Sequence, residues 1–258
     1  MLLTIDIGNT AIKSALFEGD NIIQFNRYDK LEELFDSTFS KYIDAVAFTS
    51  VVPVKSKLLS DFFNEKMSIS AYQIKSKSNF NLKIKYNSIK TLGIDRICSA
   101  EGAFYLYNNS DTHPTFKDGS FLVSVDCGTA TTINIIMYPN IFIGGMIAPG
   151  IDTMLKGLHK NTAQLPMIEK DELSWDIGND TKSSIASGVV NSAVGLIERA
   201  HKILKENYDA NYITTYLTGG NADFLSDFLS IEYQIEKELV LIGVKEIYKM
   251  NLNIISKE

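Results

Sequence analysis

The chain has 258 residues, of which 45% are hydrophobic, so it can bury a large core and suits two modest domains better than one small one. Its 25 basic and 31 acidic side chains give a formal charge of −6, which argues against a nucleic-acid-binding protein with a broad basic surface. With two cysteines and no signal-peptide pattern, we expect a cytoplasmic protein. Proline and glycine interrupt the nearly uncharged stretch 133–151, so we expect no membrane span.

Strand and helix patterns follow one another in two similar series. In the first half, the predicted strands are 2–5, 11–17 and 45–50, and the predicted helices are 30–41, one beginning at Pro53, and 94–106. In the second half, strands begin at Phe121, Thr132 and Ile141, and a helix over 181–207, a strand over 212–217 and a helix over 237–250 follow. The polar segment 108–119 separates the two series. This order predicts a duplicated α/β architecture with halves 1–115 and 116–258.

Two short acidic segments, one in each half, share a pattern. Residues 6–10 read Asp-Ile-Gly-Asn-Thr and residues 126–129 read Asp-Cys-Gly-Thr, and each joins two strand-like runs. Glycine allows close approach of the backbone to a ligand, the polar side chains add donors, and the carboxylate can hold a metal through water. The pair predicts two half-domains that face one nucleotide. Two ordinary β-turns closed by Asp and Gly are the alternative.

Further motifs occur in order along the chain: Gly93-Ile94-Asp95-Arg96, a glycine- and proline-rich segment at 144–150, Thr181 at the start of the long helix, and Thr218-Gly219-Gly220. Together with the two acidic segments, this set resembles the type III pantothenate kinases of the acetate and sugar kinase, Hsc70 and actin superfamily. The resemblance extends over most of the chain. It implies duplicated ribonuclease H-like (actin-like ATPase) domains, each a mixed β-sheet flanked by helices.

The resemblance also implies an activity: transfer of phosphate from ATP to pantothenate, giving 4′-phosphopantothenate, the first step of coenzyme A biosynthesis. It implies Mg²⁺ with ATP, a monovalent cation (K⁺ or NH₄⁺), and a homodimer. No nucleic-acid or membrane partner is expected.

The resemblance assigns the nucleotide side to both acidic segments. The expected ATP-binding residues are Asp6, Ile7, Gly8, Asn9, Thr10, Ala11, Ile12, Lys13 and Thr129. Asp6 would position Mg²⁺ through water, and Asp126 matches the ligand of the monovalent cation. For Lys13 a solvent-facing position on the strand is the alternative, and Thr218-Gly219-Gly220 fits an adenosine contact or a plain strand-to-helix turn equally well.

On the substrate side, the resemblance makes Asp95 the catalytic base that accepts the proton of the pantothenate hydroxyl. The planar fork of Arg96 suits the pantothenate carboxylate. The expected substrate-binding residues are Tyr86, Gly93, Ile94, Asp95, Arg96 and Thr181. Ser88 stands where the family usually has proline, so the loop that carries Tyr86 is expected to be less rigid than in the family.

Several alternatives stay open from the residues themselves. Asp95 fits a helix N-cap with Arg96 as a surface ion-pair partner, and Thr181 fits an N-cap that also contacts substrate. Other candidates for the whole chain are a different small-molecule kinase of the superfamily and a non-catalytic nucleotide-binding regulatory protein. A chaperone or filament protein would need a longer chain, and the charge argues against a ribonuclease H-type nuclease.

Overall fold

The computed structural model describes residues 1–37, 43–110, 113 and 115–255, with side chains described as far as Leu252. The chain divides into two compact units. Unit 1 contains Met1–Thr115, Asn140–Ile143 and the C-terminal segment from Glu238, and unit 2 contains Phe116–Pro139 and Gly144–Lys237. The first segment of unit 1 ends at Thr115, and unit 2 begins at Phe116. The C-terminal segment belongs to unit 1 although it follows unit 2 in the sequence.

Unit 1 is built on a five-stranded mixed sheet of order β3-β2-β1-β4-β5. Its strands are β1 (Leu2–Ile7), β2 (Ile12–Glu18), β3 (Asn21–Tyr28), β4 (Ala45–Ser50) and β5 (Ala71–Gln73). The central strand β1 runs antiparallel to β2 and parallel to β4. Leu3, Ile5 and Phe48 are fully buried, so both β1 and β4 lie in the core of this unit.

The helices of unit 1 are α1 (Leu31–Phe35), α2 (Pro53–Met67), α3 (Ile94–Asn108) and α7 (Leu239–Ile255). Two glycines explain why α7 belongs here. A Cβ on Gly102 of α3 would collide with the Leu239 carbonyl, and a Cβ on Gly243 of α7 would collide with the Cys98 carbonyl. The two helices therefore approach backbone to backbone at these positions.

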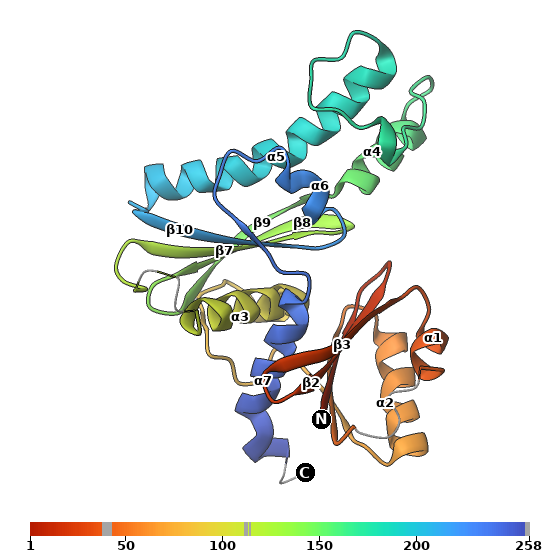
Figure 1. The fold of residues 1–258 in the computed structure, drawn as a ribbon, viewed down its shortest axis with the longest axis vertical. Helices are drawn as coiled ribbons and strands as arrows, with labels where there is room; N and C mark the ends of the chain where they lie inside the picture. The colour runs from red at the N-terminus through yellow and green to blue at the C-terminus, as the bar shows by residue number, and fades with distance from the viewer. Residues whose placement is uncertain (38–42, 111–112, 114, 256–258) are drawn as a thin grey trace. The chain divides into compact units, whose positions relative to one another are not determined.

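Unit 2 carries a second mixed sheet, in which β11-β10-β7-β8-β9 are successive neighbours. Its strands are β7 (Ser120–Cys127), β8 (Ala130–Met137), β9 (Ile141–Pro149), β10 (Tyr212–Thr218) and β11 (Gln234–Ile235), and its helices are α4 (Ile151–Asn161), α5 (Thr181–Asn207) and α6 (Ala222–Ser226). The long helix α5 runs along one face of this sheet (Figure 1). The first residues of β9 lie in unit 1, where Ile141 and Phe142 pair with β6 (Lys83–Ile84).

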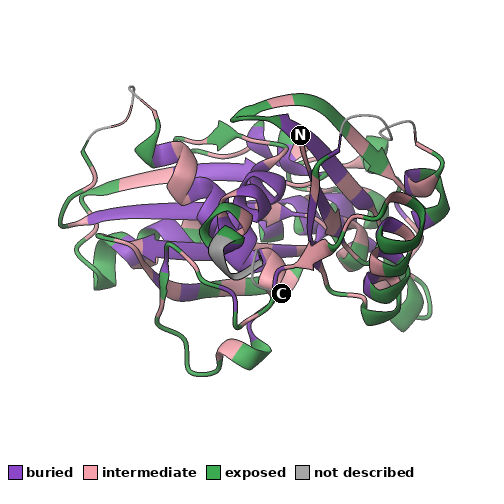
Figure 2. Ribbon diagram, turned by 90° about the horizontal axis from the view of Figure 1, so that it is seen from below, coloured by how far each residue is buried: buried purple, intermediate pink, exposed green. Residues whose placement is uncertain are grey.

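Burial follows the strands and the helix faces that pack against them, while exposed residues gather in the loops and on the outer helix faces (Figure 2). The observed bounds of β4 and α5 confirm the predicted strand and long helix. The helix α4 was not predicted. The predicted helix 30–41 is wrong for residues 36 and 37, because α1 ends at Phe35. Residues 38–41 of that prediction lie outside the described residues. Within the described residues, no helix is both long and apolar enough to cross a membrane.

Candidate functional site

The first acidic segment forms the turn between β1 and β2 in unit 1. The Gly8 N–H donates to the Ala11 carbonyl at 3.1 Å and closes the turn. Asn9 and Thr10 are exposed at its tip. The flanking members of the predicted ATP-binding set are fully buried and pair with each other across the hairpin: Ile7 and Ile12. The turn therefore presents two polar side chains from a fixed base.

Asp6 sits at the centre of the sheet, next to the turn. It pairs with Lys13 on β2 and with Thr49 on β4, so the three residues occupy one row across the strands. Asp6 and Lys13 are partly exposed, whereas Thr49 is fully buried. The predicted reach of Lys13 to the phosphates is thus compatible with its place directly beside Asp6.

Asp95 approaches the same region from α3. Burial raises the pKa of the Cys98 thiol well above its ordinary value, and the charges of Asp6 and Asp95 raise it further. Both carboxylates, one on β1 and one in the first turn of α3, thus raise the pKa of the same buried thiol. Sequence reasoning found both acids but gave no role to Cys98.

The start of α3 decides two alternatives that the sequence left open. Gly93, not Asp95, is the N-cap of α3, and Asp95 occupies its first turn, where the helix dipole favours a negative charge. Arg96 is only 5% exposed, so it is not a surface ion-pair partner. The N-cap interpretation of Asp95 and the surface interpretation of Arg96 are therefore wrong.

Tyr86 and Arg96 share an aromatic neighbour in unit 1. The ring centroid of the fully buried Phe142 lies 6.3 Å from that of Tyr86 and 6.0 Å from Cζ of Arg96. The Lys85 N–H donates to the Phe142 carbonyl at 2.9 Å and fixes the chain next to Tyr86. Two predicted substrate residues from separate segments thus lie against one ring.

Glu101 on α3 supports this segment. Its carboxylate is fully buried and accepts hydrogen bonds from the Leu82 N–H at 2.9 Å and from Nδ2 of Asn81 at 3.1 Å. Burial raises the pKa of Glu101. The sequence signal for such an anchor was present but unused: an acid among the small and apolar residues of a buried helix.

The second acidic segment lies in unit 2, at the turn between β7 and β8. A Cβ on Gly219 would lie 2.5 Å from Oδ1 of Asp126 and 2.7 Å from the backbone nitrogen of Cys127, and the φ of Gly219 is +94°. Asp126 thus rests against the turn that follows β10. Thr129 is exposed at the tip of the segment, and Cys127 is a fully buried free thiol.

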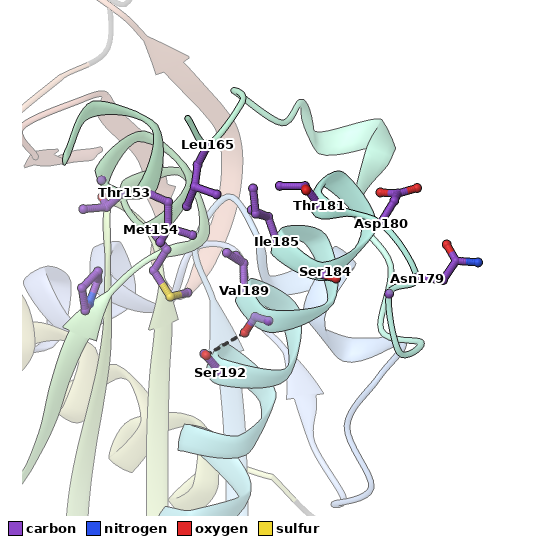
Figure 3. A pocket seen from close by; sticks show the side chains of 15 residues that line it. Thr153, Met154, Leu165, Asn179, Asp180, Thr181, Ser184, Ile185, Val189 and Ser192 are labelled. Carbon is purple, nitrogen blue, oxygen red and sulfur yellow. Dashed lines mark hydrogen bonds between the residues drawn. The ribbon is translucent and has the colours of Figure 1, made fainter. Parts of the chain in front are cut away.

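Thr181 is the first residue of α5 and lines a cavity of about 1150 Å³ in unit 2. The cavity lies between α4 and α5 and is lined by Thr153 and Met154 from α4 and by a row of α5 side chains (Figure 3). The N-cap of α5 is Asp180, whose carboxylate accepts from the Ser183 N–H at 2.9 Å. The N-cap interpretation of Thr181 is therefore wrong, although its place at the helix start is as predicted.

Comparison with known proteins assigns the chain to a family. The family model described as type III pantothenate kinase matches residues 2–202. The chain belongs to the type III pantothenate kinase family. A type III pantothenate kinase from Azobacteroides pseudotrichonymphae is 32% identical over 96% of this chain and 96% of its own length. Another, from Thermobifida fusca, is 30% identical over 97% of this chain and 100% of its own length.

Solved structures share the fold of this family member. A Campylobacter jejuni protein assigned to the Baf family of transcriptional activators superposes with a TM-score of 0.61 at 23% identity, covering 97% of this chain and 99% of that chain. A glucokinase from an Antarctic psychrotroph gives 0.51 at 13% identity, covering 95% and 97%. These likenesses confirm the predicted sugar kinase and actin-like fold.

As a kinase of this family, the protein uses ATP with a divalent metal. The described residues contain no group of three or more His, Cys, Asp or Glu side chains able to hold a metal ion. They do contain Asp6 on β1 and Asp95 in the first turn of α3, both in unit 1. This donor set fits Mg²⁺, which proteins commonly bind through one or two carboxylates together with substrate phosphates. Asp126, Thr129 and Thr181 belong to unit 2.

Proposed function

We propose that this family member transfers the γ-phosphate of ATP to the primary hydroxyl of pantothenate, forming 4′-phosphopantothenate for coenzyme A synthesis. The family match over residues 2–202 supports the reaction. The observation that carries the site is the row of Asp6, Lys13 and Thr49 across neighbouring strands of unit 1, with Asp95 in the first turn of α3 of the same unit. It supports one phosphate-side carboxylate and one acceptor-side carboxylate within unit 1.

In the proposed reaction, the pantothenate hydroxyl oxygen forms a bond to the γ-phosphorus while the bond to the β,γ-bridging oxygen breaks. Asp95 accepts the hydroxyl proton as the new bond forms, a role typically worth about 10²- to 10⁴-fold in rate. Its location in the first turn of α3 supports a charged carboxylate. Mg²⁺, when bound with ATP, supplies neutralisation of the phosphate charge.

For the nucleotide, we assign the phosphates to the first acidic segment. Asp6 holds Mg²⁺ through water, and Asn9, Thr10 and Lys13 contact phosphate oxygens. The exposure of Asn9 and Thr10 and the cross-strand pairing of Lys13 with Asp6 support these roles. The Gly8 N–H already donates to the Ala11 carbonyl within the turn. We therefore assign Gly8 a different role: its lack of a side chain lets the phosphates come close to the backbone. The remaining proposed contacts are backbone ones: Ile7, Ala11 and Ile12.

For pantothenate, we assign the carboxylate to Arg96 and further contacts to Tyr86, Gly93, Ile94 and Thr181. The ring of Phe142 beside both Tyr86 and Arg96 supports their joint use. A guanidinium can bind a carboxylate through two parallel hydrogen bonds, which fixes the orientation of the substrate. Thr181 is supported by its place on the wall of the unit 2 cavity.

In unit 2, we assign Thr129 to the nucleotide and Asp126 to a monovalent cation, K⁺ or NH₄⁺. A carboxylate oxygen is a hard ligand and suits such an ion. The contact of Gly219 with Asp126 supports a fixed position for this carboxylate.

We also propose a homodimer in the cytoplasm. Exposed Trp175 and Ile177 support an interface, and the free cysteines support a reducing compartment.

The test is a coupled ADP-release assay with ATP, Mg²⁺ and pantothenate, run in potassium and in sodium buffer. We expect ADP release that depends on pantothenate and is faster in potassium. Asp95→Asn should lose about 10²-fold or more in kcat. Asp61→Asn is the matched control, because Asp61 is an exposed aspartate on α2.

Three results would contradict parts of the proposal separately. Wild-type protein that releases no ADP with pantothenate present would remove the activity. Full activity of Asp95→Asn would remove the base assignment and leave the kinase in place. Equal rates in potassium and sodium would remove the cation preference alone.

A further inference from the structure

The carbonyl of Thr129 is held by two donors from the beginning of α4. The Gly150 N–H donates to it at 3.0 Å, and Oγ1 of Thr153 donates to it at 2.6 Å. Gly150 has no space for a side chain, because a Cβ there would collide with the Gly128 carbonyl and lie 2.9 Å from the Thr129 carbonyl oxygen. The second acidic segment therefore rests directly on the first turn of α4.

Of the two donors, only Thr153 uses its side chain, so its hydrogen bond can be removed by substitution. It is exposed, so water could satisfy its hydroxyl, and threonine is a weak helix former. In a helix, a threonine hydroxyl often bonds to a carbonyl of its own preceding turn. Here it bonds instead to a carbonyl 24 residues earlier in the chain. The hydroxyl thus fixes a loop rather than its own helix.

The same side chain lies on the wall of the unit 2 cavity. Thr153 lines this cavity from α4, and Thr181 lines it from the start of α5 (Figure 3). Thr153 therefore contacts the second acidic segment, which we assign to the nucleotide, and lines the same cavity as Thr181, which we assign to the substrate. From this location, the Thr153 hydroxyl can fix the position of Thr129.

We propose that Thr153 is a positioning residue: its hydroxyl holds the Thr129 carbonyl so that the second acidic segment keeps the conformation that binds ATP. The inference rests on the proposed function, because that function assigns Thr129 to the nucleotide. A hydrogen bond of this kind contributes about 0.5–1.5 kcal/mol, which corresponds to about 2- to 12-fold in binding.

The test compares Thr153→Val, which keeps the shape and removes the donor, with Thr153→Ser, which keeps the donor. We expect Thr153→Val to raise the KM for ATP by about 3- to 10-fold. The KM for pantothenate should stay within about twofold, and Thr153→Ser should restore the wild-type KM for ATP. Ser192→Ala is the matched control: this hydroxyl lies in the same cavity but donates to the Gly188 carbonyl of its own helix at 2.6 Å (Figure 3).

An unchanged KM for ATP in Thr153→Val would overturn the inference. So would equal rises in both KM values, or a Thr153→Ser protein as defective as Thr153→Val. If the wild type does not phosphorylate pantothenate, the proposed function fails by itself. Calorimetric titration of the same proteins with ATP and Mg²⁺ then decides the role of Thr153: weaker binding by the valine variant alone supports it, and equal binding overturns it.

Discussion

The carboxylate of Asp95 occupies the space into which a side chain on Gly93 would project. A Cβ at this position would collide with Oδ1 of Asp95, so the glycine at the N-cap of α3 permits the location of the proposed base. We expect Gly93→Ala to lower kcat by about 10²-fold, the cost typical of a displaced catalytic group. Steady-state kinetics with ATP and pantothenate measure this.

Gly195→Ala is the control for Gly93→Ala. Gly195 lies within α5, and a Cβ there meets nothing within 4 Å. This variant should keep the wild-type kcat and raise the free energy of unfolding by up to about 1 kcal/mol, because alanine is the better helix former. If Gly93→Ala keeps the wild-type kcat while Asp95→Asn is inactive, the packing of Gly93 against Asp95 does not set the position of the base.

Gly219 and Gly220 should respond differently to the same substitution. Gly219 has a φ of +94° and packs against Oδ1 of Asp126, whereas a Cβ on Gly220 meets nothing within 4 Å. We expect Gly219→Ala to raise the K⁺ concentration needed for half-maximal activity by about 10-fold or more, because it displaces the proposed cation ligand and strains the backbone. Gly220→Ala should behave as the wild type in the same potassium titration. Identical titration curves for the two variants would argue against Asp126 as the cation ligand.

The sequence predicted the elements whose signals are local. The helix Thr181–Asn207 has a sustained apolar periodicity, and its observed bounds are those expected. The strand Ala45–Ser50 is a short run of buried residues, and it was also found. The pairing of Asp6 with Lys13 follows from the short turn between their strands, so the place of this lysine beside Asp6 could be anticipated.

Long-range contacts could not be predicted in this way. α7 packs on α3 through Gly102 and Gly243, which are far apart in the chain and carry no pattern that names the partner. The N-cap of α5 was placed one residue late, because Asp180 and Thr181 are both good capping residues and only the geometry separates them. Buried Glu101 was missed since an acid in a helix usually faces solvent.

Asp20 provides a test of the packing of α7 on unit 1. Lys245 is only 1% exposed, and its Nζ lies 2.8 Å from Oδ1 of Asp20 and 3.1 Å from Oε1 of Glu246. Hydrogen bonds from Lys245 and Lys249 hold the pKa of Asp20 well below its ordinary value of 3.8. The stabilisation is therefore present above the ordinary pKa and is lost as the pH falls below it.

We expect Asp20→Asn to lower the free energy of unfolding near neutral pH by about 1 kcal/mol, a small figure because Asp20 is largely exposed and solvent screens the pair. The difference from wild type should shrink in acid, as the wild-type carboxylate is protonated. Urea unfolding at several pH values measures this, with Asp61→Asn as the exposed control. An Asp20→Asn deficit that stays constant into acid would exclude the ion pair as its source.

His201 links α5 to β10 within unit 2, and its buried ring predicts a second pH dependence. Nε2 of His201 lies 2.8 Å from Oγ1 of Thr215, and the residue is 6% exposed. Burial lowers the pKa of His201 from 6.5 to about 4, with a smaller contribution from the charge of Lys205. As the pH falls from about 6.5 to about 4, the unfolded chain takes up a proton on this histidine before the folded chain does. The free energy of unfolding therefore falls over this pH range.

The full loss amounts to about 3 kcal/mol once the pH has passed below both pKa values, and it should be absent above neutral pH. We expect His201→Asn to be less stable than wild type near pH 7, because it loses the buried hydrogen bond, yet to change less between about pH 7 and pH 5. Urea unfolding of both proteins at the two pH values gives this difference in slope. His159→Asn, a change of an exposed histidine on α4, should keep the wild-type slope. If His201→Asn also keeps that slope, another group is responsible for the acid sensitivity of unit 2.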